Sequence, residues 1–129
     1  ISDQFSLRGS YTYTDSTAED SAGKDIDEIR RPRHVAALVG NYALQKTNIN
    51  MSISYNGEQD DTFFPPFPLP QEQVTLDSFV LVNVAINHQL TEKIALTARI
   101  DNLLDEDYEE VFGFTPPGIG AYAGVRLAW

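Results

Sequence analysis

Apolar and polar residues alternate along most of this chain with a period of two. In the last nine residues the positions Ala121, Ala123, Val125, Leu127 and Trp129 are apolar, and the residues between them are mixed. Successive side chains of a β-strand point to opposite faces, so this pattern predicts a strand with one apolar face. The alternation continues to the terminal aromatic residue, and we therefore expect the strand to run to the end of the chain.

Five earlier segments alternate in the same way, and turn-forming residues separate them. The six predicted strands cover residues 4–14, 33–44, 48–56, 78–88, 93–101 and 121–129. Their lengths approach the roughly 9 to 11 residues with which a tilted strand crosses a bilayer, whereas strands of soluble domains average about 5 to 6 residues. The sequence therefore predicts an all-β fold, an antiparallel up-and-down meander of about six strands.

The connections between the predicted strands are alternately long and short. The short turns are residues 45–47 and 89–92, and the long loops are residues 15–32, 57–77 and 102–120. The long loops hold most of the acidic residues. Short turns at one rim and long loops at the other are typical of outer-membrane β-barrels. This asymmetry places Gly120 near the outer rim and Trp129 near the periplasmic rim.

Composition narrows the class of function. The chain of 129 residues contains no cysteine and has a net charge of −10, so disulfides and thiolate metal sites are excluded and nucleic acid is a poor partner. No apolar run approaches the roughly 18 residues of a transmembrane helix. The two histidines, His34 and His88, belong to no recognisable nucleophilic constellation. We therefore predict no enzyme activity, no metal site and no cofactor.

Two other classes of protein fit parts of the pattern. A soluble β-sandwich binding module would also alternate, with its apolar face in a core. However, the second face of residues 48–56 consists of Asn and Ser rather than charged residues, and aromatic residues near the strand ends resemble the girdle of a membrane barrel. An outer-membrane hydrolase is the less favoured alternative, because no nucleophile motif accompanies the histidines.

One long loop carries an unusual aromatic segment, residues 63–70, with the sequence Phe-Phe-Pro-Pro-Phe-Pro-Leu-Pro. The segment predicts either an aromatic contact for a large ligand, through Phe63, Phe64 and Phe67, or packing between neighbouring loops. The preceding pair Asp60-Asp61 is interpreted as solvated loop charge, because its spacing matches no calcium-binding loop.

Three short motifs occur in order in the remaining sequence. The segment Asn102-Leu103-Leu104-Asp105-Glu106-Asp107-Tyr108 resembles the N-L-[FL]-D-x-x-Y motif near the end of TonB-dependent outer-membrane receptors. The segment Arg31-Pro32-Arg33-His34 resembles an R-x-P-R-H-type segment upstream in that family. Pro117-Gly118, before a strand that ends in Trp129, resembles the P-G-R ending of the family, with Ile119 in place of the usual Arg.

Elementary chemistry gives these motifs structural roles. Asn102 and Asp105 can hydrogen-bond nearby backbone where a strand ends. Tyr108 can lay its ring against the barrel wall with its hydroxyl in water, and it is also a candidate ligand contact. Pro32 suits a position that donates no ladder hydrogen bond. The full structural set is Arg31, Pro32, Arg33, Asn102, Asp105, Tyr108, Pro117, Gly118 and Trp129.

The resemblance implies that residues 1–129 form the C-terminal segment of a transmembrane barrel of about 22 strands, without its plug domain. Ile1 would then mark a cut and Trp129 an authentic C-terminus. The implied function is active uptake of an iron–siderophore complex, or a similar large scarce ligand, across the bacterial outer membrane. The implied partners are outer-membrane lipid, the rest of the barrel and its plug, the TonB energy-coupling complex and the outer-membrane assembly machinery. The isolated segment is expected to need the rest of its barrel or to self-associate.

Overall fold

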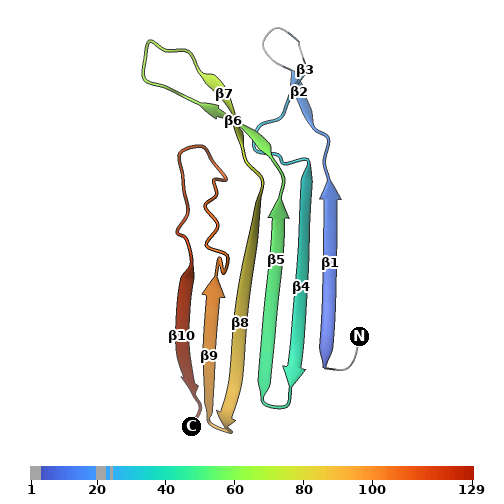
Figure 1. Ribbon diagram of the computed structural model, residues 1–129, viewed down its shortest axis with the longest axis vertical. Helices are drawn as coiled ribbons and strands as arrows, with labels where there is room; N and C mark the ends of the chain where they lie inside the picture. The colour runs from blue at the N-terminus through green and yellow to red at the C-terminus, as the bar shows by residue number, and fades with distance from the viewer. Residues whose placement is uncertain (1–3, 20–22, 24) are drawn as a thin grey trace.

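The fold is a single antiparallel sheet with small hairpins extending from one end (Figure 1). The computed structural model describes residues 4–19, 23 and 25–129. The sheet has six strands in the order β1-β4-β5-β8-β9-β10, each antiparallel to its neighbours. The strands are β1 (Phe5–Tyr13), β4 (His34–Leu44), β5 (Thr47–Asn56), β8 (Phe79–Thr91), β9 (Ile94–Asp101) and β10 (Gly120–Leu127). This order confirms the predicted up-and-down meander.

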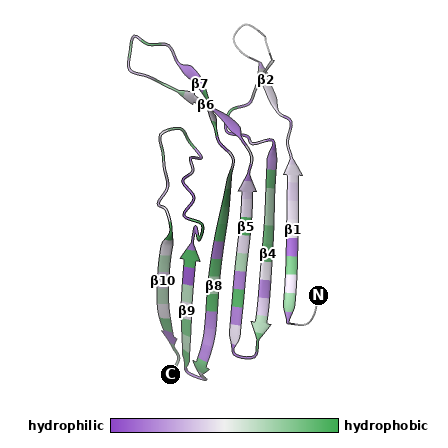
Figure 2. Cartoon of the chain, viewed as in Figure 1, coloured by the Kyte–Doolittle hydropathy of each residue, from purple (hydrophilic) through white to green (hydrophobic). Residues whose placement is uncertain are grey.

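The pairing register sets apolar positions opposite apolar positions across all six strands. One row of directly paired residues crosses the sheet through Phe5, Tyr42, Ile49, Ile86, Ala98 and Ala123. The neighbouring row crosses it through Ser6, Asn41, Asn50, Ala85, Arg99 and Tyr122. Directly paired residues point to the same side of a sheet. The sheet therefore has one continuous apolar face and one mixed, largely polar face, and Figure 2 shows the alternation as bands of colour along the strands.

The apolar face is open. Leu38 and Met51 on neighbouring central strands are 40% and 41% exposed, and Val125 on β10 is 64% exposed. A soluble sandwich would cover such a face with a second sheet, but no element in the described part of the chain packs against it. The same part of the chain contains no helix that is long and apolar enough to cross a membrane. Within the described part of the chain no second layer covers the apolar face, so this face needs an apolar environment from outside the sheet.

The two ends of the sheet differ as the sequence predicts (Figure 1). The turns β4–β5 and β8–β9 are tight and lie at the end that also holds the start of β1 and the end of β10. Residues 14–33, 57–78 and 102–119 connect strands at the opposite end. Two strand ends differ from the prediction by more than one residue: β8 continues to Thr91 through an irregularity at Gln89, and β10 ends at Leu127. The backbone N–H of Ala128 still donates to the Lys93 carbonyl, 2.9 Å away, but Trp129 is fully exposed.

The long loops contain regular structure that the alternation did not predict. The first includes β2 (Thr17–Glu19) paired with β3 (Asp25–Asp27), and the second includes β6 (Gln59–Phe63) paired with β7 (Glu72–Leu76). The sequence of β6 is largely polar and has no period-two apolar signal. Cross-strand hydrogen bonds support this hairpin instead, because Thr75 Oγ1 and Gln73 Nε2 donate to the carboxylate of Asp60 at 3.0 and 3.2 Å. We call the described parts of the three long connections, residues 14–33, 57–78 and 102–119, the loop layer.

Candidate functional site in the loop layer

Asp61 joins the three long loops at one point. Its side chain is fully buried. One carboxylate oxygen accepts hydrogen bonds from Arg30 Nε at 2.9 Å and from the Thr62 N–H at 2.8 Å. The other accepts from the Phe112 N–H at 2.8 Å. Because Arg30 and Phe112 lie in the first and third loops, a single carboxylate fixes all three loops relative to one another.

The environment of Asp61 keeps it ionised. Burial alone would raise the pKa of this carboxyl, but hydrogen bonds from the Phe112 and Thr62 N–H groups and from Arg30 outweigh it and hold the pKa below its usual value of 3.8. The prediction that Asp60-Asp61 is solvated loop charge is wrong for Asp61, whose side chain is buried and hydrogen-bonded.

Further contacts close the layer around this carboxylate. The N–H of Arg30 donates to the Asp60 carbonyl at 2.7 Å. Gln59 Nε2 donates to the Glu110 carbonyl at 2.9 Å. The rings of Phe63 and Phe112 lie 5.1 Å apart in a tilted arrangement. Backbone, amide and aromatic contacts thus connect the same pairs of loops as Asp61 does.

The residues of the Asn102 motif build the base of the third loop. Asn102 is 6% exposed and has a φ of 51°. Its own N–H donates to Asn83 Oδ1 at 2.8 Å, and its side chain exchanges two 2.9 Å hydrogen bonds with the backbone of Glu106. A small amide side chain can adopt this left-handed conformation and bond nearby backbone at once. Asn102 therefore stops β9 and starts the loop.

Asp105 and Gly118 meet across the two ends of that loop. Asp105 Oδ1 accepts a 2.8 Å hydrogen bond from the Ile119 N–H. A Cβ at position 118 would lie 2.5 Å from the same oxygen, so any other residue here would force the Asp105 side chain to shift. Pro117 lies beside this contact in the sequence. The structure thereby brings together the Asn102 motif and the Pro117-Gly118 motif, whose contacting residues Asp105 and Ile119 lie 14 positions apart in the sequence.

Tyr108 packs inside the loop layer. Its ring centroid lies 4.4 Å from that of Phe79, which is 4% exposed and begins β8. Burial of the phenol, with the nearby Glu110 charge as a smaller cause, raises the pKa of Tyr108 above its usual value of 10.0. Tyr108 is therefore half-buried, with part of its ring covered by Phe79.

The aromatic segment divides into a packed part and an exposed part. Phe63 contacts Phe112 as described, whereas Phe64 and Phe67 at the tip of the β6–β7 hairpin are 70% and 97% exposed. Phe114 in the third loop is 73% exposed. The loop layer therefore offers exposed rings on two of its loops, and the ring of Phe114 was not predicted from the sequence.

The Arg31-Pro32-Arg33 segment leads from the first loop into β4. Arg31 Nε lies 3.1 Å from a Glu28 carboxylate oxygen. The carbonyl of Arg33 accepts a hydrogen bond from the Thr14 N–H at 2.9 Å, and this contact closes the base of the first loop. The described residues contain no group of three or more His, Cys, Asp or Glu side chains that could hold a metal ion.

Comparison with known proteins connects this architecture to a family. Residues 2–103 match the family described as TonB dependent receptor-like, beta-barrel. The chain is 31% identical over 97 residues to the vitamin B12 transporter BtuB of Vibrio cholerae, and 30% identical over 99 residues to that of Photobacterium profundum. The aligned parts are 75% and 77% of this chain but 15% of each relative. The chain thus spans a small fraction of the length of these relatives.

Solved structures share the fold. The ferripyoverdine receptor of the Pseudomonas aeruginosa outer membrane, bound to ferripyoverdine, superposes with a TM-score of 0.78 at 18% identity, over 98% of this chain and 18% of that chain. The siderophore receptor PirA of Acinetobacter baumannii gives a TM-score of 0.76 at 14% identity, over 98% and 20% of the two chains. Together with the two-faced sheet and the long loops at one end, the match over residues 2–103 shows that this chain belongs to the TonB-dependent receptor-like β-barrel family.

Proposed function

We propose that this chain supplies part of the wall and the extracellular loops of a receptor for active uptake of a large, scarce ligand such as an iron–siderophore complex. The observation that carries the proposal is the loop layer, which Asp61 fixes as one unit and which exposes Phe64 and Phe67 at its tip. Preorganised loops with exposed aromatic rings bind large ligands at a low entropic cost.

The polar face of the sheet suits the inside of such a receptor. It carries amide and hydroxyl groups on β5 and the cations Arg8, Arg99 and Arg126 on β1, β9 and β10. The apolar face would contact outer-membrane lipid. The free edges of β1 and β10 would pair with the rest of the barrel, and a chain isolated from it would self-associate through these edges.

The remaining partners belong to the whole receptor. We propose that the plug domain and, through it, the TonB energy-coupling complex act on the barrel to which this chain contributes. We also propose that the outer-membrane assembly machinery reads the final strand, β10 with Trp129. A second candidate ligand is vitamin B12, because the curated relatives with 30–31% identity are named as its transporters.

Replacement of both exposed rings, Phe64→Ala with Phe67→Ala, is expected to weaken ligand binding at least about tenfold, because buried aromatic anchors carry much of the energy of an interface. The measurement is equilibrium binding to the full-length receptor, with a panel of iron-loaded siderophores and cyanocobalamin as probes. The control is Phe5→Ala at the opposite end of the sheet, which should bind as the wild type does. The uptake proposal fails if the wild-type receptor binds neither class of probe, and the role of the two rings fails if the double variant binds normally.

A further inference from the structure

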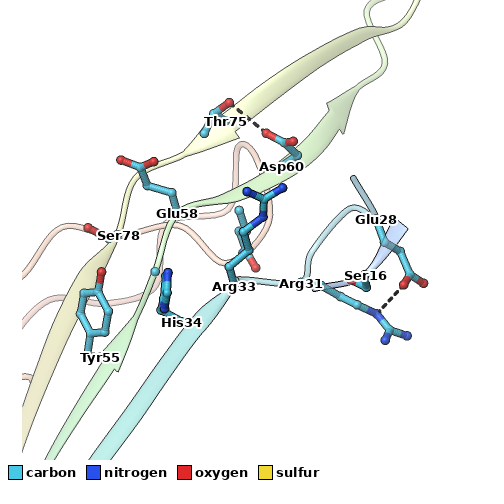
Figure 3. A pocket seen from close by; sticks show the side chains of 12 residues that line it. Ser16, Glu28, Arg31, Arg33, His34, Tyr55, Glu58, Asp60, Thr75 and Ser78 are labelled. Atoms are coloured by element: carbon cyan, nitrogen blue, oxygen red, sulfur yellow. Dashed lines mark hydrogen bonds and ion pairs between the residues drawn. The ribbon is translucent and has the colours of Figure 1, made fainter. Parts of the chain in front are cut away.

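A polar cleft of about 460 Å³ lies between the sheet and the loop layer (Figure 3). His34 and Tyr55 line it on the side of the sheet. His34 pairs with Tyr13, and Tyr55 pairs with Val80, so both residues belong to the apolar face. Gly57 donates its N–H to the His34 carbonyl at 2.8 Å, and a Cβ at this position would crowd the same oxygen at 3.0 Å. The cleft therefore opens on the lipid-facing side of the sheet.

An aromatic cluster beside the cleft marks its level relative to the membrane. The Tyr11 hydroxyl shares a 2.8 Å hydrogen bond with His34 Nδ1, and the Tyr13 and His34 rings lie 5.3 Å apart. Tyr11 and Tyr13 are both more than half exposed. Aromatic rings with a polar tip gather at the boundary between lipid chains and head groups. The cleft begins at this boundary, at the end of the sheet that carries the long loops.

The walls of the cleft carry charge and hydroxyl groups. Arg31 and Arg33 line it from the segment before β4, and Ser78 and Thr75 add hydroxyl groups. Guanidinium groups and hydroxyl donors are the usual ligands of phosphate oxygens.

Three carboxylates also line the cleft. A carboxylate oxygen of Glu28 lies 3.1 Å from Arg31 Nε, and the Asp60 carboxylate accepts hydrogen bonds from Thr75 and Gln73. Glu58 also lines the cleft, and its side chain is exposed. An anion that enters must therefore compete with Glu28 for Arg31 and is repelled by Glu58, so removal of the Glu58 charge should strengthen its binding.

We propose that this cleft holds the phosphate-bearing head group of a lipid of the outer leaflet. Arg31 and Arg33 would bind the phosphate, and the acyl chains would lie along the apolar face below Tyr55. This site lies outside the barrel and is separate from ligand uptake. The inference rests on the orientation of the apolar face toward lipid and does not depend on which ligand the receptor takes up.

The test uses the full-length receptor in a neutral detergent, with dimyristoyl phosphatidylglycerol as the probe and native mass spectrometry to count bound lipid. Replacement of both cations, Arg31→Gln with Arg33→Gln, is expected to weaken lipid binding roughly tenfold to thirtyfold. Each basic residue near an anionic head group contributes about a threefold to sixfold factor in affinity, and the two factors multiply. Glu58→Gln should strengthen binding. Arg8→Gln makes the same charge change on the opposite face and should leave binding unchanged.

Three results would overturn the proposal. The first is wild-type lipid binding by the double variant. The second is an equal loss for Arg8→Gln, which would indicate a general charge effect. The third is displacement of the lipid by millimolar inorganic phosphate, which would indicate a site for a free anion. If the double variant fails to fold, the Glu58→Gln variant tests the proposal instead, because unchanged lipid binding by this variant would contradict a head-group site in the cleft. Binding of the transported ligand should be the same in Arg31→Gln with Arg33→Gln and in Glu58→Gln as in the wild type, so failure of this inference is distinct from failure of the uptake proposal.

Discussion

Replacement of Met51 by Arg is expected to destabilise the folded receptor by about 2 to 4 kcal/mol, whereas the same replacement of its neighbour Ser52 is expected to cost less than about 1 kcal/mol. Met51 lies in the middle of β5 and faces the apolar side, where it pairs with Gly40 and Val84. Ser52 lies on the polar side, where it pairs with Val39 and Asn83. A guanidinium that enters hydrocarbon loses its hydration, and one that enters a water-filled lumen keeps it.

The two variants form a matched pair, because they add the same side chain to adjacent residues of one strand. The measurement is the free energy of unfolding of the full-length receptor in lipid vesicles, from denaturant titration. Equal costs for the two variants would contradict the assignment of the faces, and a larger cost for Ser52→Arg would reverse it.

Replacement of Asp61 by Asn is expected to loosen the loop layer by about 1 to 3 kcal/mol. The neutral amide cannot accept all three hydrogen bonds that the carboxylate accepts, and a buried N–H or a charged donor left without a partner carries that penalty. Hydrogen exchange measured by mass spectrometry should speed up in residues 59–63 and 110–113. Asp60→Asn is the control, because Asp60 accepts from exposed donors within its own hairpin. Equally fast exchange in the control would contradict the role of Asp61.

The lowered pKa of Asp61 predicts how the loop layer responds to pH. A carboxyl whose pKa is lower in the folded state than in the unfolded state stabilises the fold above its unfolded pKa. Its contribution should therefore be complete at neutral pH and should decline as pH falls below the usual value of 3.8 toward the lowered pKa. Protection factors, in which the exchange rates are corrected for their intrinsic pH dependence, should fall in the same two segments on acidification in the wild type but not in Asp61→Asn. The same fall in both proteins would assign the effect to other carboxyl groups.

The sheet could be predicted from sequence because one physical rule governs it. A strand with lipid on one side and water on the other must alternate, and the apolar residues of β5 and β8 do so without interruption. The ends of the strands were less predictable. The alternation of residues 121–129 suggested a strand to Trp129, but the partner β9 begins at Ile94 and offers no residues beyond the Leu127 pair apart from the Lys93 carbonyl.

The loop layer could be predicted only in part, because its contacts join residues far apart in the chain. The motif around Asn102 was recognisable, since an Asx residue at a strand end has a local role. The pairing of Asp61 with Arg30 and Phe112 spans 31 and 51 residues, and no local pattern signals it. The same contacts explain why Phe63 and Tyr108, two of the four candidate ligand contacts, are packed against other rings.

Family membership also decides between the classes of protein that the sequence left open. The relatives are receptors and transporters of the bacterial outer membrane rather than enzymes. The soluble sandwich and the hydrolase hypotheses are therefore both wrong. The open apolar face gives the physical reason for the first, because a soluble domain cannot leave such a surface uncovered.

The central claim is that the apolar face of this sheet contacts lipid while the polar face lines an aqueous lumen. A nitroxide scan of β5 tests it most directly, and the absence of cysteine from this chain keeps the labelling sites within it specific. Single cysteines at residues 48–54 of the full-length receptor in vesicles would be spin-labelled and exposed to oxygen, which concentrates in lipid, and to a water-soluble nickel complex. We predict oxygen access at Ile49, Met51 and Ile53 and nickel access at the residues between them. Access without this two-residue period, or with the opposite phase, would contradict the account.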